Sequence, residues 1–126
     1  MNSGHLKTLT VVRSAIGASS WLSPIAAGRL FGLDASSDVS AALYLRMAAS
    51  RDFALAAGPV LADRRSRRLL LRIGAACDVG DIVAVLVALR AGKISRFGAV
   101  AFITASLVML MLGAKAHTRE AHQPEQ

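Results

Sequence analysis

The sequence predicts an all-α protein in which a bundle of four long helices crosses a membrane. Apolar residues make up 54% of its 126 residues and charged residues only 18%, below the roughly 25% of a typical soluble domain. The apolar residues gather in four long segments. The chain has a net charge of +7, and its positive residues gather at the ends of those segments, where lysine and arginine anchor membrane helices.

Each apolar segment is long enough to supply the ~20 residues with which a helix crosses a bilayer. We expect no strands, because the segments are rich in alanine and leucine and lack two-residue alternation. The predicted helices cover residues 8–28, 40–62, 69–90 and 95–113. They form a single integral membrane domain over residues 1–126, in which residues 115–126 are a polar, frayed tail.

The first two helices contain helix-disturbing residues. Trp21, Ser23 and Pro24 predict that the first helix kinks or reaches the membrane interface there, because proline removes a helical hydrogen bond. This helix lacks the leucine-rich core of a signal peptide, so we expect it to remain in the mature protein. Gly58-Pro59 predicts a bend or an end of the second helix. The fourth helix contains no charge over residues 97–113 and gives the clearest transmembrane signal.

The basic loops predict the orientation of the bundle. The segment 63–68 is the most basic short loop, so we expect it in the cytoplasm together with both termini. The loop with Asp34 and Asp38 then lies outside. The loop with Arg90, Lys93 and Arg96 opposes this orientation, since it places three positive charges outside.

A set of charged residues lies within the second and third apolar segments. A charge at the centre of a membrane helix costs about 2.5–3.5 kcal/mol, so such residues normally face the bundle interior and have partners. They are Arg46, Arg51 and Asp52 in the second helix and Arg72, Asp78 and Asp81 in the third. Arg46 and Arg72 lie nearer the helix ends, where their side chains can extend to lipid headgroups.

Helical rise places three of these charges at one depth. At ~1.5 Å per residue, Arg51 lies roughly 16 Å from the cytoplasmic end of its helix, and Asp78 and Asp81 lie roughly 14 Å and 18 Å from theirs. Asp78 and Asp81 share one helix face because of their i, i+3 spacing. We therefore predict that Arg51 faces the Asp78–Asp81 pair.

The predicted mid-membrane layer has more acidic than basic groups. Arg51 set against Asp52, Asp78 and Asp81 gives a balance of −2. We expect that at least one aspartate, Asp78 or Asp81, carries a proton at neutral pH or has a cation beside it. Alternatively, an ion pair of this kind serves only to fix the helix register.

The sequence contains no recognisable catalytic, metal or cofactor site. His5, His117 and His122 lie near the termini and outside the predicted helices, and no metal-binding, phosphate-binding or nucleophile motif is present. The three aspartates alone form only a weak oxygen-ligand set. We predict no metal and no cofactor. Basic residues are not interleaved with aromatic ones, which argues against nucleic-acid binding.

Short motifs resemble a known family. Phe31-Gly32-Leu33, the stretch Ala49 to Ala56 containing Arg51-Asp52, and Asp78-Val-Gly-Asp81 resemble a family of small four-helix bacterial membrane proteins without assigned activity, loosely similar to DoxX-like proteins. Ala49 stands where that family has glycine. The resemblance covers about residues 8–113; it implies the fold and singles out Arg51, Asp52, Asp78 and Asp81, but implies no reaction.

Three functions remain open for this multi-pass cell-membrane protein. The first is a non-catalytic accessory or lipid-associated module whose polar centre organises the bundle, with membrane lipids, a second copy or another membrane protein as partners. The second is a small proton- or cation-coupled carrier that uses Asp78 or Asp81. The third is a membrane enzyme acting on a lipid or quinone, against which the missing nucleophile–base pair argues. A cavity that reaches Asp78 would favour the second or third function, and a dry cluster would favour the first.

Overall fold

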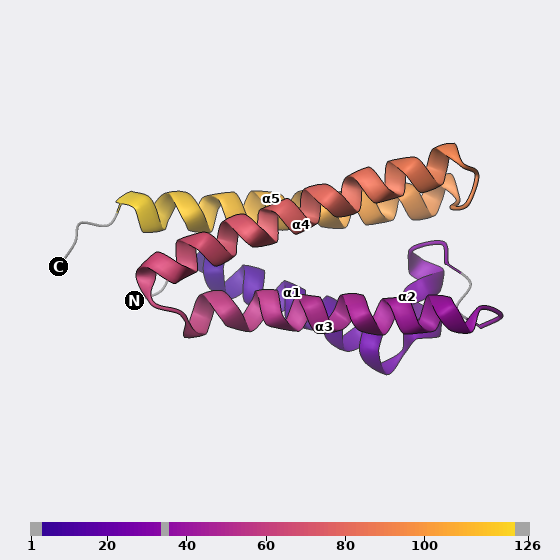
Figure 1. Cartoon of the computed structure of the whole chain (residues 1–126), viewed down its shortest axis with the longest axis horizontal. Helices are drawn as coiled ribbons and strands as arrows, with labels where there is room; N and C mark the ends of the chain where they lie inside the picture. Colours follow the sequence, from indigo (N-terminus) through magenta and orange to yellow (C-terminus); the bar gives the residue numbers. More distant parts are fainter. Residues whose placement is uncertain (1–3, 34–35, 123–126) are drawn as a thin grey trace.

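The computed structural model describes residues 4–33 and 36–122, which form helices and no strand (Figure 1). The all-α prediction is therefore confirmed for this part of the chain. The helices are α1 (Gly4–Leu22), α2 (Pro24–Leu30), α3 (Val39–Leu61), α4 (Arg64–Arg90) and α5 (Arg96–His122).

The four long helices form two layers. α1 packs mainly on α3, and α4 packs mainly on α5, while contacts of α1 with α5 and of α3 with α4 join the two pairs. Successive long helices run in opposite directions, so the α3–α4 turn lies at the same end of the bundle as the N-terminal end of α1 and the C-terminal end of α5 (Figure 1). This arrangement brings one face of every long helix towards a common centre.

The predicted first helix is divided into α1 and α2. The break falls at Ser23, one residue before Pro24, which is the first residue of α2. Proline has no N–H to donate to the carbonyl four residues earlier, so the helix cannot continue through it undisturbed. α1 also begins at Gly4 rather than at the predicted Thr8. Of the predicted acidic loop, Asp34 lies outside the described residues.

The basic segment after α3 is helical and not a loop, which corrects the prediction. Asp63 is the N-cap of α4, and its carboxylate accepts a hydrogen bond of 3.1 Å from the backbone N–H of Ser66. This capping starts α4 at Arg64, five residues before the predicted start. α3 in turn continues through Pro59 and ends at Leu61.

The predicted polar tail is also largely helical, because α5 continues to His122. The three histidines therefore lie within helices and not outside them as expected: His5 in α1, and His117 and His122 in α5. Ala116 is fully buried and packs in a core with Leu9, so burial extends α5 past the end of its apolar segment.

A tight contact holds the end of α2 on α5. Gly32 has a φ of +73°, a conformation that glycine adopts without strain, and it lies on Gly98 of α5. A Cβ atom on Gly98 would overlap the carbonyl group of Phe31. This close approach also places the Phe31 ring 4.8 Å from that of Phe102. The Phe31-Gly32 motif therefore fixes one aromatic wall of the central cavity described below.

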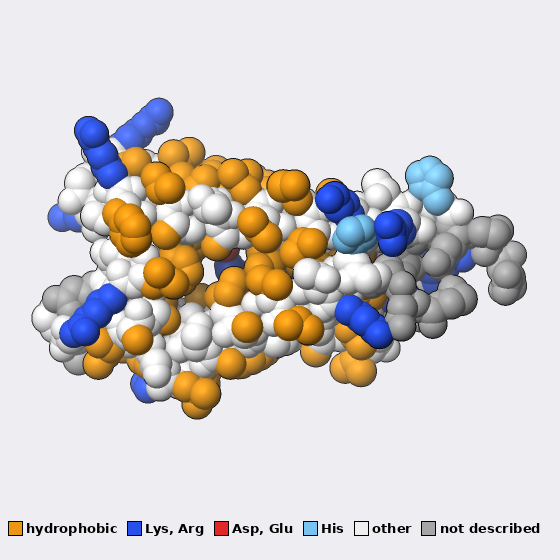
Figure 2. Space-filling model, turned by 180° about the vertical axis from the view of Figure 1, so that it is seen from behind, with side chains coloured by type: hydrophobic (Ala, Val, Ile, Leu, Met, Phe, Trp, Pro, Cys, Tyr) orange, Lys and Arg blue, Asp and Glu red, His pale blue; other side chains and the backbone are white. Residues whose placement is uncertain are grey.

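The outer surface of the bundle is rich in apolar side chains, with lysine and arginine gathered towards its ends (Figure 2). Among the described residues, the stretch Arg96–Arg119 of α5 is long and apolar enough to cross a membrane, judged by length and composition. One such helix is weak evidence by itself, because the core helix of a soluble protein can meet the same criterion.

Candidate functional site

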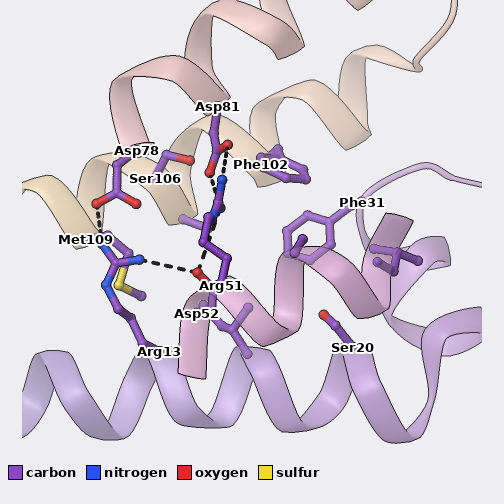
Figure 3. Close-up of a pocket in the computed structure, with 14 residues that line it drawn as sticks. Arg13, Ser20, Phe31, Arg51, Asp52, Asp78, Asp81, Phe102, Ser106 and Met109 are labelled. Carbon is purple, nitrogen blue, oxygen red and sulfur yellow. Dashed lines mark hydrogen bonds and ion pairs between the residues drawn. The ribbon is translucent and has the colours of Figure 1, made fainter. Parts of the chain in front are cut away.

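Five charged side chains from three helices meet at the centre of the bundle (Figure 3). Salt bridges join them into one set, which we call the ionic cluster. Its members are Arg13 of α1, Arg51 and Asp52 of α3, and Asp78 and Asp81 of α4. The structure thus brings together the four residues that the sequence singled out, Arg51, Asp52, Asp78 and Asp81, and it adds Arg13.

Arg51 and Asp81 form the best-aligned pair of the ionic cluster. Nη1 of Arg51 donates to Oδ1 of Asp81 at 2.9 Å, and Nη2 donates to Oδ2 at 2.7 Å. Two parallel hydrogen bonds of this kind are the strongest geometry between a guanidinium and a carboxylate. Arg51 also lies 3.8 Å from Asp52. Within the described residues, no salt bridge or hydrogen bond joins Arg51 to Asp78, so the predicted pairing of Arg51 with both aspartates of α4 is found only for Asp81.

Asp78 pairs instead with Arg13. Nη2 of Arg13 donates a short hydrogen bond to Oδ2 of Asp78, and Nη1 donates to Oδ1 of Asp52 at 3.4 Å. Arg13 and Asp78 are both buried, with only 4% and 3% of their surfaces exposed. Removing either partner would leave the other charge buried without compensation. This pair therefore ties α1 to α4 across the centre of the bundle.

Arg13 was not among the site residues predicted from the sequence. The cause was the predicted helix start. From Thr8, Arg13 lies roughly 7.5 Å into the helix, but from Gly4 it lies roughly 14 Å in, at ~1.5 Å per residue. A usable signal was present, since Arg13 interrupts an apolar run and the predicted charge balance of −2 required another cation.

With Arg13 included, the ionic cluster has two positive and three negative groups, a balance of −1. Asp78 and Asp81 each have an arginine of their own. Asp52 has only the longer contacts, 3.4 Å to Arg13 and 3.8 Å to Arg51. Its side chain is nevertheless only 14% exposed. Asp52 is therefore the carboxyl group with the weakest compensation.

Arg46 and Arg72, the secondary candidates, lie outside the ionic cluster. Both are exposed residues. Nε of Arg46 donates to the carbonyl of Trp21 at 3.4 Å, and Nε of Arg72 donates to Nε2 of His117 at 3.2 Å. Their side chains thus point towards the periphery of the bundle, as expected for arginines near helix ends.

A cavity of about 60 Å³ opens beside the ionic cluster. All five charged residues line it, together with the rings of Phe31 and Phe102 and the hydroxyls of Ser20 and Ser106 (Figure 3). One water molecule needs about 10–15 Å³ on this measure, so the cavity has room for a few waters but not for a lipid tail or a quinone ring.

Several polar groups in this cavity lack a protein partner. Ser20 and Ser106 are each only 5% exposed, and in the described part of the chain neither hydroxyl hydrogen-bonds to a protein group. Nε of Arg51 is buried and also without a partner there. Buried polar groups of native proteins almost always have hydrogen-bond partners, and ordered water supplies those that the protein does not. Water in the cavity would satisfy these groups.

The described residues contain no group of three or more histidine, cysteine or carboxylate side chains that could hold a metal ion. Two of the three carboxylates in the cavity, Asp78 and Asp81, are paired with guanidinium groups, and no histidine lines the cavity.

Comparison with known proteins leaves the family open. The sequence matches no protein-family model, and no curated protein or solved structure is detectably similar. The resemblance to DoxX-like proteins thus stays an expectation, and the function has to be argued from the site.

Proposed function

We propose that the chain is a multi-pass membrane protein in which all four long helices cross the bilayer. The supporting observation is an inverted distribution of side chains. Large apolar residues are exposed on every long helix, including Val11 on α1, Met47 on α3, Val83 on α4 and Val100 on α5. The ionic cluster, by contrast, lies inside. A soluble protein of this size would have the opposite arrangement.

The four charged residues nearest the middle of α3 and α4 belong to the ionic cluster. α3 contains Arg51 and Asp52, and α4 contains Asp78 and Asp81. Paired and turned inwards, such residues are compatible with a membrane-spanning helix. α5 itself does not behave as the core helix of a soluble protein, since only 28% of its apolar stretch is buried inside the structure.

Cysteine labelling tests the membrane arrangement. In a Cys77→Ala background, Ser37→Cys is expected to react with a membrane-impermeant maleimide from outside the cell, and Ala62→Cys only after the membrane is opened. The expectation follows from the arginines at the start of α4, which favour the cytoplasmic side. Reaction of both positions from the same side without opening the membrane would contradict the four-span arrangement.

We further propose that the cavity binds and releases a proton, as the working site of a small carrier that moves protons across the membrane. The observation that supports it is the charge balance of −1 beside a cavity with unpartnered hydroxyls. An uncompensated carboxylate in this setting is strongly disfavoured, and one bound proton removes the imbalance. Waters held by Ser20 and Ser106 would provide the path by which that proton reaches the cluster.

The geometry favours Asp52 as the carboxyl group that holds the proton. Sequence reasoning preferred Asp78 or Asp81, but each of these accepts a direct hydrogen bond from its own arginine. Those bonds stabilise the ionised carboxylate. Asp52 has the longest contacts with cations and lines the cavity.

The other two functions receive less support. A purely structural polar centre does not need a cavity with unsatisfied hydroxyls. An enzyme needs an activated nucleophile, and neither Ser20 nor Ser106 has a base hydrogen-bonded to it in the described structure. The cavity is also too small for a lipid or quinone substrate.

Proton flux into liposomes, reported by an enclosed pH-sensitive dye under an imposed potassium diffusion potential, tests this function. The intact protein is expected to accelerate acidification over empty liposomes, and Asp52→Asn to abolish the gain. Asp38→Asn, which changes an exposed carboxylate at the start of α3, is the control and should retain the flux.

Infrared spectroscopy provides the second readout. A protonated-carboxyl band is expected at neutral pH, and it should disappear in Asp52→Asn but persist in Asp38→Asn. If the intact protein shows neither flux nor this band, the ionic cluster is a structural element and the proposal is wrong.

A further inference from the structure

A second polar site lies at the end of the bundle that contains the α3–α4 turn. A groove of about 570 Å³ opens there between the first turns of α4 and the end of α5. We call it the basic groove. It is lined by Arg65, Ser66, Arg68, Leu69, Arg72 and His117.

The helical register gathers the positive charge of this groove on one face of α4. Arg65, Arg68 and Arg72 follow the i, i+3, i+7 spacing that places side chains above one another along a helix. Together they carry three positive charges, and none of the six lining residues is acidic. Asp63, which caps α4, offsets part of the charge of Arg65 from outside the groove. The groove is therefore suited to an anion.

His117 positions one of these arginines. Nε of Arg72 donates to Nε2 of His117 at 3.2 Å, which holds the guanidinium over the groove from the side of α5. This bond uses only Nε, and the terminal Nη groups of Arg72 have no hydrogen-bond partner in the described part of the chain. Such terminal groups bind phosphate oxygens well.

An apolar strip continues from the groove towards the middle of the bundle. Leu69 lines the groove and is 59% exposed, and Ile73, one turn further along α4, is 45% exposed. Figure 2 shows the same change along the molecule, with lysine, arginine and histidine side chains at this end and apolar side chains beyond them. A free phosphate would use only the charged part of this surface, whereas a lipid would use both parts.

We infer that the basic groove binds the headgroup of an anionic phospholipid, with its phosphate among Arg65, Arg68 and Arg72 and its acyl chains along Leu69 and Ile73. The inference rests on the proposed membrane location but not on the proposed proton site. Clustered arginines at the end of a membrane helix are a known means of holding anionic lipids.

Lipid titration of the detergent-solubilised full chain, followed by native mass spectrometry, tests the inference. Phosphatidylglycerol is expected to bind more tightly than phosphatidylcholine, whose choline group opposes the arginines. Arg68→Gln with Arg72→Gln should weaken phosphatidylglycerol binding about 30-fold, which corresponds to about fivefold per arginine. The control is Arg90→Gln with Arg96→Gln, which removes equal charge from exposed positions at the opposite end and should leave the affinity unchanged.

Several outcomes would overturn the inference. Equal affinity for the two lipids, or an equal loss in the control variant, would show that net charge and not the groove determines binding. Displacement of phosphatidylglycerol by millimolar inorganic phosphate would assign the groove to a free anion. The Asp52→Asn variant should retain lipid binding, so loss of proton flux and loss of lipid binding are separate failures. A full chain that stays monodisperse without detergent would contradict the membrane location itself.

Discussion

The guanidinium of Arg13 lies against the carboxylate of Asp78, although 65 residues separate them in the chain. The pair joins α1 to α4, two long helices that otherwise pack mainly on α3 and on α5. It thus links the two layers of the bundle at its centre.

Arg13→Ala should destabilise the bundle strongly. It leaves Asp78 buried without its partner, and breaking a buried ion pair costs about 3–5 kcal/mol. Arg46→Ala is the matched control, since Arg46 is exposed and makes one long hydrogen bond of 3.4 Å; its cost should be below about 1 kcal/mol. Denaturation in mixed micelles, followed by circular dichroism, measures both. Equal midpoints for the two variants would show that Asp78 is stabilised by other means.

Arg51 and Asp81 should be coupled energetically. Their bidentate contact predicts that Arg51→Ala and Asp81→Ala together cost less than the sum of the single variants, with a coupling energy of about 0.5–3 kcal/mol. A double-mutant cycle in the same denaturation assay measures it. The control cycle combines Arg51→Ala with Asp38→Ala, and the free-energy costs of these two variants are expected to add. Additivity of Arg51 and Asp81 would instead mean that the pair contributes no specific interaction.

Gly98→Ala should disrupt the contact between α2 and α5. The added Cβ would overlap the carbonyl of Phe31 and lie 2.9 Å from Cα of Gly32, so backbone has to move. Overpacking of this kind costs about 1–3 kcal/mol. At Gly80 an added Cβ meets nothing within 4 Å, so Gly80→Ala should be neutral or slightly stabilising. Thermal unfolding in detergent compares the two, and a neutral Gly98→Ala would show that this contact is loose.

The start of α4 should lose protection at acidic pH. Hydrogen bonds from the hydroxyl and the backbone N–H of Ser66 lower the pKa of Asp63 below its ordinary value. Because the folded state binds the proton less readily than the unfolded state, the capping contribution is present at neutral pH and is lost as the pH falls below about 4.

Hydrogen exchange of the first turn of α4 measures this effect. Asp63→Asn retains a good N-cap without the ionisable group, so its protection should not depend on pH in this range. The same acid-induced loss in Asp63→Asn would assign the pH dependence to a different group.

Local patterns in the sequence were enough to predict the all-α class, the existence and order of four long helices and the break near Pro24, because hydrophobic segments and proline act locally. It also identified Arg51, Asp52, Asp78 and Asp81, because a charge inside an apolar segment has to find a partner wherever the chain folds. Helix ends were less well predicted: the start of α4 depends on the Asp63 cap, and the end of α5 depends on the burial of Ala116.

The pairing of the charges, in contrast, depends on how the helices pack. The sequence placed Arg51 opposite both aspartates of α4, but rotation of each helix about its axis and the depth of α1 gave Asp78 to Arg13 and Asp81 to Arg51. Pairing depends on the relative rotation and offset of separate helices, which small contacts such as Gly32 on Gly98 help to set and which no local pattern encodes. The same packing left Asp52 with the longest contacts and a cavity beside it, so the proposed site is a property of the assembled bundle.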